Sequence, residues 1–151
     1  MSTILFDLDG TLLPMDVHHF TKLYFGGLQK AFPQYDAKKL IDGVLAGMKQ
    51  MVSNNGSRTN EQAFIPAFEQ ASGINFAENE AAFLQYYRTD FAAVKAACTL
   101  PEESAQLIDI LQNKGYQVAI ATNPLFPQIA TYSRLDWLGL DPKRFPLVTT
   151  Y

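Results

Sequence analysis

The most informative stretch of the chain is Ile4-Leu5-Phe6-Asp7-Leu8-Asp9-Gly10-Thr11-Leu12-Leu13. It opens with apolar strand formers, and Gly10 tolerates the positive φ that a sharp turn requires. While the chain is extended, Asp7 and Asp9 lie on the same face, about 6 to 7 Å apart along the strand. The stretch therefore predicts a buried strand that carries two carboxylates into a turn.

Two carboxylates at the end of a strand form a candidate site for catalysis and metal binding. Open parallel sheets bind ligands at the carboxyl ends of their strands. Asp7 and Asp9 would repel each other unless a cation such as Mg²⁺, which prefers oxygen ligands, lies between them. A metal-bound aspartate can act as a nucleophile while a neighbouring carboxyl group passes a proton to the leaving oxygen. The alternative is structural: Asp7 caps the strand and Asp9-Gly10 forms an ordinary turn.

From Met15 to about Cys98 the apolar residues recur at helical spacing, without a strand signal. Turn-forming residues divide this region into four predicted helical segments, of which the last two run about 60–71 and 78–97. Aromatic residues at helical spacing in these two segments are predicted to form a core rather than a ligand site. The region therefore reads as an all-helical insertion after the first strand.

The rest of the chain alternates between helices and strands. Pro101 opens a helix that Lys114-Gly115 closes, and Val118 to Ala121 form a second buried strand. A helix over about 126–138 and a third strand over Leu147 to Tyr151 follow. Strand, helix, strand, helix, strand is typical of a parallel sheet with right-handed crossovers. The predicted fold class is α/β: a Rossmann-like parallel-sheet core, residues 1–13 and 100–151, with an inserted α-helical cap, residues 14–99.

The second strand ends at Thr122-Asn123-Pro124, a second candidate binding element. If the two strands pair in parallel, the Thr122 hydroxyl lies beside the carboxyl end of the first strand. A hydroxyl and free backbone amides at a strand-to-helix transition can bind a phosphate. Taken alone, the same residues are also typical of a simple helix start.

Composition excludes several classes of protein. The 151 residues carry twelve basic and fifteen acidic side chains, a net charge of −3, without a basic tract for a nucleic-acid backbone. The single cysteine excludes an internal disulfide. The sequence lacks a signal peptide and the run of about 20 apolar residues that crosses a bilayer. We expect a soluble cytoplasmic protein with neither nucleic-acid nor membrane partners, and with an oligomeric state that the sequence leaves open.

The run from Ile4 to Leu13 resembles the first motif of the haloacid dehalogenase superfamily, apolar residues followed by Asp-x-Asp-Gly-Thr. The resemblance implies that Asp7 attacks phosphorus, and that Asp9 acts as general acid and base and gives its backbone carbonyl to Mg²⁺. An aspartate at the second position favours phosphoryl transfer over carbon–halogen cleavage. Gly10 and Thr11 would contribute to the binding loop.

The apolar run that ends in Thr122-Asn123 is similar to the family's second motif. The resemblance implies that Thr122 binds the phosphoryl group and that Asn123 shapes the loop. The third motif, a lysine, and the fourth, an acidic group that completes the Mg²⁺ shell, would lie beyond Tyr151. We therefore expect a protein truncated at its carboxyl end, with the first strand as an unpaired apolar edge that favours self-association.

Together these features predict Mg²⁺-dependent hydrolysis of a small phosphate monoester through an aspartyl-phosphate on Asp7. The cap would exclude water and select the substrate, hinging near Leu13-Pro14 and Leu100-Pro101. Two alternatives remain. A phosphoacceptor signalling module would also use carboxylates and Mg²⁺ on a parallel sheet, and a noncatalytic fragment or binding domain would keep the fold without turnover.

Overall fold

A computed structural model describes residues 2–151. Its sheet consists of β1 (Thr3–Phe6) and β2 (Gln117–Ile120), which pair in parallel from Thr3 opposite Gln117 to Phe6 opposite Ile120. Both strands were expected from their short apolar runs, but β1 is not buried as predicted: its residues alternate between exposed and half-buried, whereas three of the four residues of β2 are buried. The long connection between the strands is what a parallel pair requires. The small parallel sheet and the surrounding helices confirm a mixed α/β fold.

The predicted third strand over Leu147 to Tyr151 does not form as a regular element. Only one parallel bridge, between Ile120 and Val148, joins this segment to β2. Beyond it, the backbone N–H of Tyr151 donates to the carbonyl oxygen of Phe126 at 3.2 Å. The prediction was wrong in this respect because the segment turns toward the loop after β2 instead of continuing the ladder.

Residues 17–97, called here the helical segment, contain no strand. Their elements are α1 (Val17–Ala31), α2 (Ala37–Val52), α3 (Asn60–Ser72), α4 (Phe76–Arg88) and the 3₁₀ helix η1 (Asp90–Ala97). Each α-helix begins at a side-chain cap, provided by Asp16, Asp36, Thr59 and Asn75 respectively. The predicted single helix over 78–97 is instead broken at Thr89, where α4 ends and the tighter η1 begins.

Two glycines explain why α2 and α3 pack so closely. A Cβ atom added at Gly43 would lie 2.7 Å from the Cβ of Ser72, and one at Gly47 would overlap the Phe64 ring. The interface therefore has room only for glycine, which lacks a Cβ atom, at these two positions. Because α3 and α4 carry the predicted aromatic residues, this close packing brings several rings into one core.

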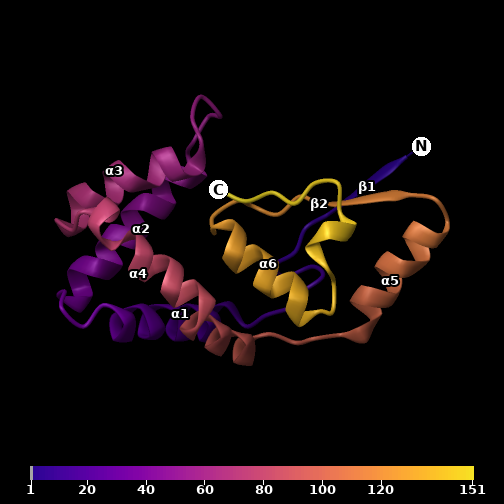
Figure 1. Ribbon diagram of the computed structural model, residues 1–151, viewed down its shortest axis with the longest axis horizontal. Helices are drawn as coiled ribbons and strands as arrows, with labels where there is room; N and C mark the ends of the chain where they lie inside the picture. Colours follow the sequence, from indigo (N-terminus) through magenta and orange to yellow (C-terminus); the bar gives the residue numbers. More distant parts are fainter. Residues whose placement is uncertain (1) are drawn as a thin grey trace.

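The remaining residues, 2–16 and 98–151, are called here the sheet part. They contain α5 (Glu102–Asn113), α6 (Gln128–Trp137) and the short 3₁₀ helix η2 (Pro142–Arg144), besides the two strands. Their own core includes Leu8, Leu13, Ile108, Ile120 and Leu135. Figure 1 shows α1 to α4 gathered at one end of an elongated molecule, β1, β2 and α5 at the other, and α6 between them.

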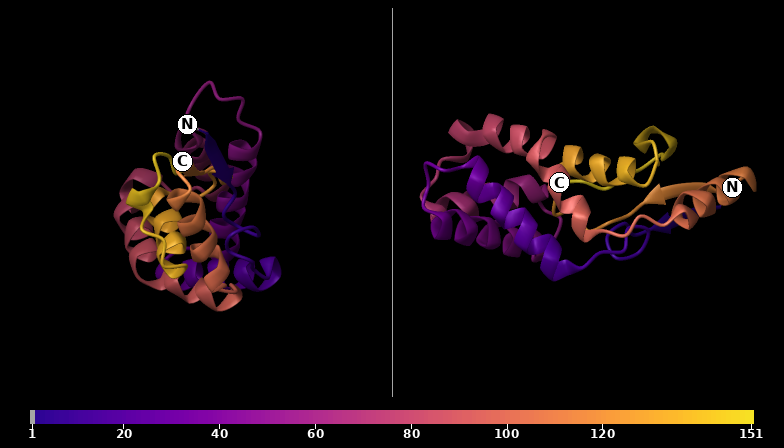
Figure 2. Two further views of the ribbon diagram at one scale, coloured as in Figure 1. Left: turned by 90° about the vertical axis from the view of Figure 1, so that its right-hand side faces the viewer. Right: turned by 90° about the horizontal axis from the view of Figure 1, so that it is seen from below.

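The chain crosses between these two parts at two places that lie side by side. Met15 and Cys98 form an antiparallel bridge, and the N–H of Thr99 donates to the carbonyl oxygen of Pro14 at 2.8 Å. The right-hand view of Figure 2 shows the two connecting segments running between the helical segment and the sheet. None of the helices described in residues 2–151 combines the length and apolar character that a bilayer crossing requires.

Candidate active site

The turn that follows β1 is built on the backbone of Leu8. The N–H groups of Thr11 and Leu13 both donate to the carbonyl oxygen of Leu8, at 3.2 and 2.8 Å. Gly10 adopts a φ of 82°, a conformation that is strained for residues with a Cβ atom. Leu8 and Leu13 are buried and anchor the turn in the core of the sheet part. The two aspartates on either side of Leu8 are thereby held near the end of β1.

Asp7 is the exposed member of the pair. The hydroxyl of Thr11 donates a long hydrogen bond, 3.4 Å, to its Oδ2 atom. Gly10 and Thr11 are also exposed, so these three predicted site residues lie together on the surface of one turn. A ligand from solvent can therefore reach the Asp7 carboxylate.

Asp9 lies in a different environment, although only Leu8 separates it from Asp7. Its side chain is 29% exposed and forms an ion pair with Nη1 of Arg134 through Oδ2. Its other oxygen, Oδ1, is buried and has no hydrogen-bond partner among the described residues. Burial raises the pKa of Asp9 above its ordinary value, and the Asp7 charge adds to this, while the Arg134 guanidinium opposes it. The two carboxylates are thus chemically distinct.

Sequence reasoning missed Arg134. It lies on α6, its side chain is only 1% exposed, and its guanidinium carbon lies 4.5 Å from the centre of the Phe126 ring. Its Nε donates to the carbonyl oxygen of Ala130, and Nη2 donates to Oγ1 of Thr131, each at 3.2 Å. A signal did exist, because Arg134 lies one turn after Ala130 on the face of the predicted helix that should be apolar.

The loop after β2 starts beside the end of β1. The N–H of Ala121 donates to the carbonyl oxygen of Phe6 at 2.8 Å, which continues the pairing past the last residue of β2. Thr122 is therefore brought to the same edge of the sheet as the turn that carries Asp7. Thr122 is buried, and its carbonyl oxygen accepts a hydrogen bond from the Thr149 hydroxyl at 2.5 Å.

Asn123 is exposed, and its backbone carbonyl accepts a hydrogen bond from the N–H of Leu125 at 2.8 Å. The loop therefore turns tightly at Pro124. At this turn the helical segment touches the sheet part, because the amide of Asn60, the first residue of α3, donates to the Pro124 carbonyl oxygen at 2.9 Å. The loop after β2 is thus held from the side of the helical segment as well.

The oxygen atoms near the turn suit a hard cation. The Asp7 carboxylate is exposed, and none of the backbone hydrogen bonds within the turn uses the Asp9 carbonyl oxygen. Both are donors of the kind that Mg²⁺ prefers. Within residues 2–151, however, the structure contains no group of three or more histidine, cysteine or acidic side chains placed to hold a metal. The two donors fit Mg²⁺ but supply only part of its shell.

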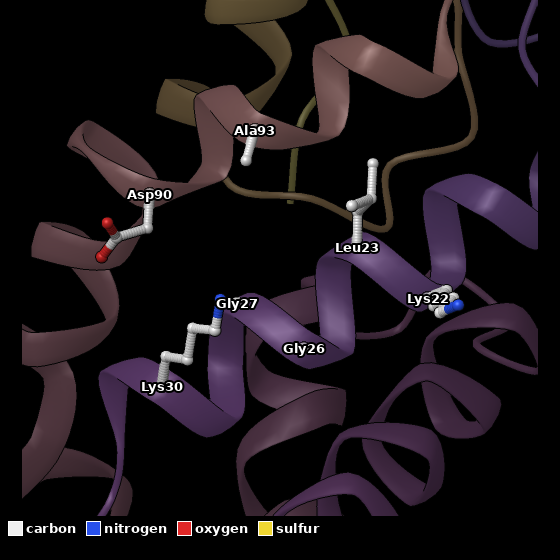
Figure 3. A pocket seen from close by; sticks show the side chains of 7 residues that line it. All are labelled: Lys22, Leu23, Gly26, Gly27, Lys30, Asp90 and Ala93. Atoms are coloured by element: carbon white, nitrogen blue, oxygen red, sulfur yellow. The ribbon is translucent and has the colours of Figure 1, made fainter.

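A cavity of about 440 Å³ lies elsewhere, between α1 and η1. Figure 3 shows its lining, with Lys30 from α1 and Asp90 from η1 on opposite walls and Gly26 and Gly27 along α1. None of the residues of the two loops described above lines it. We therefore take the acidic turn as the candidate active site because of its two carboxylates, and not because of a cavity volume.

A family model described as a hydrolase, haloacid dehalogenase-like hydrolase, matches residues 1–144. No curated protein and no solved structure matches the chain significantly. The match includes both loops of the candidate site and the helical segment between them. Because the matched region spans nearly the whole sequence, the chain belongs to the haloacid dehalogenase-like hydrolase family.

Proposed function

We propose that the chain is a Mg²⁺-dependent phosphoric monoester hydrolase that acts on a small phosphorylated metabolite through an aspartyl-phosphate on Asp7. The observation that carries the proposal is the contrast between the two carboxylates of the turn. Asp7 is exposed and free to attack, whereas Asp9 is partly buried, is ion-paired with Arg134 and has a pKa that burial raises above its ordinary value. Family membership supports hydrolase chemistry.

The reaction needs two steps. In the first, an Asp7 carboxylate oxygen bonds to phosphorus as the bond between phosphorus and the ester oxygen breaks, and Asp9 gives a proton to that oxygen. In the second, a water oxygen attacks phosphorus, Asp9 takes the water proton, and the bond from Asp7 to phosphorus breaks.

The Asp7 carboxylate and the Asp9 backbone carbonyl would hold Mg²⁺ in this proposal. When bound, the ion neutralises negative charge on the phosphate and on Asp7, so that the two anions can meet. Asp9 then serves through two different atoms: its backbone oxygen for the metal and its side chain for the proton.

Substrate binding is assigned to Gly10, Thr11, Thr122 and Asn123. Thr11 already donates toward Asp7, and a hydroxyl in that position is also within reach of a phosphoryl oxygen bound there. Thr122 follows the strand that pairs with β1, so its place at the sheet edge supports a role in phosphate binding. The substrate would be a small molecule, in keeping with the absence of a basic tract, and the protein would act in the cytoplasm.

We also propose that residues 14–99 form a cap over a core made of residues 1–13 and 100–151. The paired crossings support this division, because both connections run through one narrow contact at Met15 and Cys98. The contact between Asn60 and Pro124 is a further point at which the two parts meet, and it would close or open with the cap. A cap that closes over the turn would exclude water from the phosphoaspartate.

The direct test is hydrolysis of p-nitrophenyl phosphate with Mg²⁺ by the wild-type chain and by Asp7→Asn. The variant keeps the shape of the side chain but removes the nucleophilic charge, so kcat/KM should fall by at least about 10³-fold. Asp42→Asn is the matched control, because it removes the same charge from an exposed position on α2. Equal activity in wild type and Asp7→Asn rules out the nucleophile.

A noncatalytic or phosphoacceptor role is the second candidate. The incomplete donor set favours the noncatalytic alternative, since the described residues contain no cluster of three metal-binding side chains. Acid-quenched mass spectrometry after incubation with acetyl phosphate separates the possibilities. A stable phosphate on Asp7 without turnover indicates a phosphoacceptor, and neither phosphate nor turnover indicates a binding domain.

A further inference from the structure

We propose that Arg134 is a positioning residue for the acid and base function of Asp9, and that it connects Asp9 to the packing of the helical segment. The inference rests on the proposed function in one respect, namely that the Asp9 side chain takes part in proton transfer. The structure shows a buried guanidinium, that of Arg134, which donates a hydrogen bond to one oxygen of the Asp9 side chain, Oδ2.

The geometry of Arg134 leaves it little freedom. Three of its nitrogen atoms donate to three different partners, namely the Ala130 carbonyl oxygen, the Thr131 hydroxyl and Oδ2 of Asp9. The first two partners belong to α6 itself and set the direction of the guanidinium plane. The third hydrogen bond therefore fixes where the Asp9 carboxylate lies relative to α6.

Because Arg134 is both charged and buried, it depends on Asp9 as its counter-charge. A side chain that is only 1% exposed cannot hold a positive charge without a compensating group. Asp9 forms the only ion pair to Arg134 found in residues 2–151. Arg134 binds Oδ2, and Oδ1 has no hydrogen-bond partner among the described residues, so Arg134 alone fixes the orientation of the Asp9 carboxyl group.

Arg134 also contacts the interface with the helical segment. Its guanidinium lies over the ring of Phe126, 4.5 Å from the ring centre. Phe126 packs in turn against Tyr24, at 5.6 Å between ring centres, and against Phe91, at 6.0 Å. Figure 1 shows α6, which carries Arg134, lying between the sheet and the helical segment. If α1 or η1 shifted against α6, the Phe126 ring and the Arg134 guanidinium would therefore transmit the displacement to Asp9.

A purely structural role is the competing explanation, and the variants are chosen to separate the two. Arg134→Met removes the charge and roughly keeps the volume, whereas Arg134→Lys keeps the charge and loses the planar fork. Arg144→Met is the control, because Arg144 also pairs with an aspartate, Asp109 at 2.5 Å, but on the surface. Hydrolysis of p-nitrophenyl phosphate with Mg²⁺ is measured on folded protein only, as judged by circular dichroism.

We expect Arg134→Met to lower kcat by about 10 to 10²-fold while KM changes less than about threefold, because a misplaced acid slows the step without weakening binding. Arg134→Lys should recover part of kcat, and Arg144→Met should leave it unchanged. If Arg134→Met does not fold, Arg134→Lys supplies the comparison. A folded Arg134 variant with wild-type kcat overturns the proposal.

A second measurement does not depend on activity. Urea unfolding of wild type, Asp9→Asn, Arg134→Met and the double variant forms a thermodynamic cycle. Non-additive effects support the pairing, and additive effects overturn it even if the enzyme is active. If the wild type lacks phosphatase activity, the proposed function fails, while the cycle still decides whether Arg134 positions Asp9.

Discussion

The helical segment buries an almost continuous set of aromatic rings, whereas the sheet part exposes more of its large apolar side chains, at β1 and α5 among other places. Leu5 on β1 is 62% exposed, while Phe68 and Phe91 in the helical segment are fully buried. The predicted catalytic residues belong to the less covered region. The aromatic core therefore lies in the helical segment and the predicted catalytic residues lie in the sheet part, and α6 contacts both parts.

The largest effect on stability is expected for Gly47→Ala in the helical segment. An added methyl group would overlap the Phe64 ring, so α2 and α3 must separate, which costs about 1 to 3 kcal/mol of unfolding free energy. Urea unfolding monitored by circular dichroism measures the loss.

Gly26→Ala is the matched control for this prediction, because a Cβ atom there meets nothing within 4 Å and Gly26 also lies in a helix. Replacement of a mid-helix glycine by alanine should stabilise the protein by up to about 1 kcal/mol. If both variants lose the same stability, tight packing of α2 against α3 is not what the helical segment depends on.

A smaller effect, part of which appears only at high pH, is expected at the buried tyrosine pair of the helical segment. The Tyr24 and Tyr87 hydroxyls are 2.9 Å apart, and burial raises the pKa of Tyr24 to about 12. In the unfolded chain Tyr24 loses its proton near pH 10, so its contribution to stability is complete below that pH and is lost as the pH rises toward 12.

Tyr24→Phe should flatten this part of the stability curve between pH 10 and 12, measured by urea unfolding at each pH. The variant also loses one buried hydrogen bond, worth about 1 kcal/mol at neutral pH. Tyr116→Phe is the control, because Tyr116 is 40% exposed in the sheet part. A Tyr24→Phe curve parallel to that of the wild type would contradict the prediction.

The smallest effect on stability, and the clearest on association, is expected at the edge of the sheet part. β1 pairs with β2 on one side, and no described residue pairs with its other side. Leu5→Lys should change the unfolding free energy by less than about 0.5 kcal/mol but reduce self-association, because a charged edge resists pairing between chains.

Sedimentation velocity at several concentrations measures the association. Val52→Lys is the matched control, because Val52 is 65% exposed at the end of α2, where no strand edge exists. A wild-type chain that stays monomeric at all concentrations would contradict the predicted edge pairing, and so would equal reductions by the two variants.

Local patterns were enough to predict several features of the site. The apolar run before Asp7 predicted β1, and Gly10 predicted the turn with a positive φ. The run before Thr122 predicted β2, and parallel pairing then required both loops to lie at one sheet edge. The roles of Asp7, Asp9, Gly10, Thr11, Thr122 and Asn123 stay predictions.

Other features depended on contacts between distant residues, and local patterns missed them. Thr89 interrupts the helical periodicity over 78–97 without a proline or glycine to mark the break. The segment after Leu147 has strand-forming residues, yet Tyr151 packs against Phe64 of α3, with ring centres 6.4 Å apart. Propensity describes a segment alone, whereas at Tyr151 packing against α3 decided the conformation.

The sequence by itself determined β1, β2 and the turn at Gly10, because these depend on neighbours within a few residues. Only the tertiary structure decided that Asp7 is exposed while Asp9 is ion-paired, since the partner of Asp9 lies 125 residues away on α6. Identical side chains two positions apart thus differ chemically because α6 contacts one and not the other. Burial and a buried counter-charge are properties of packing, and no local pattern encodes them.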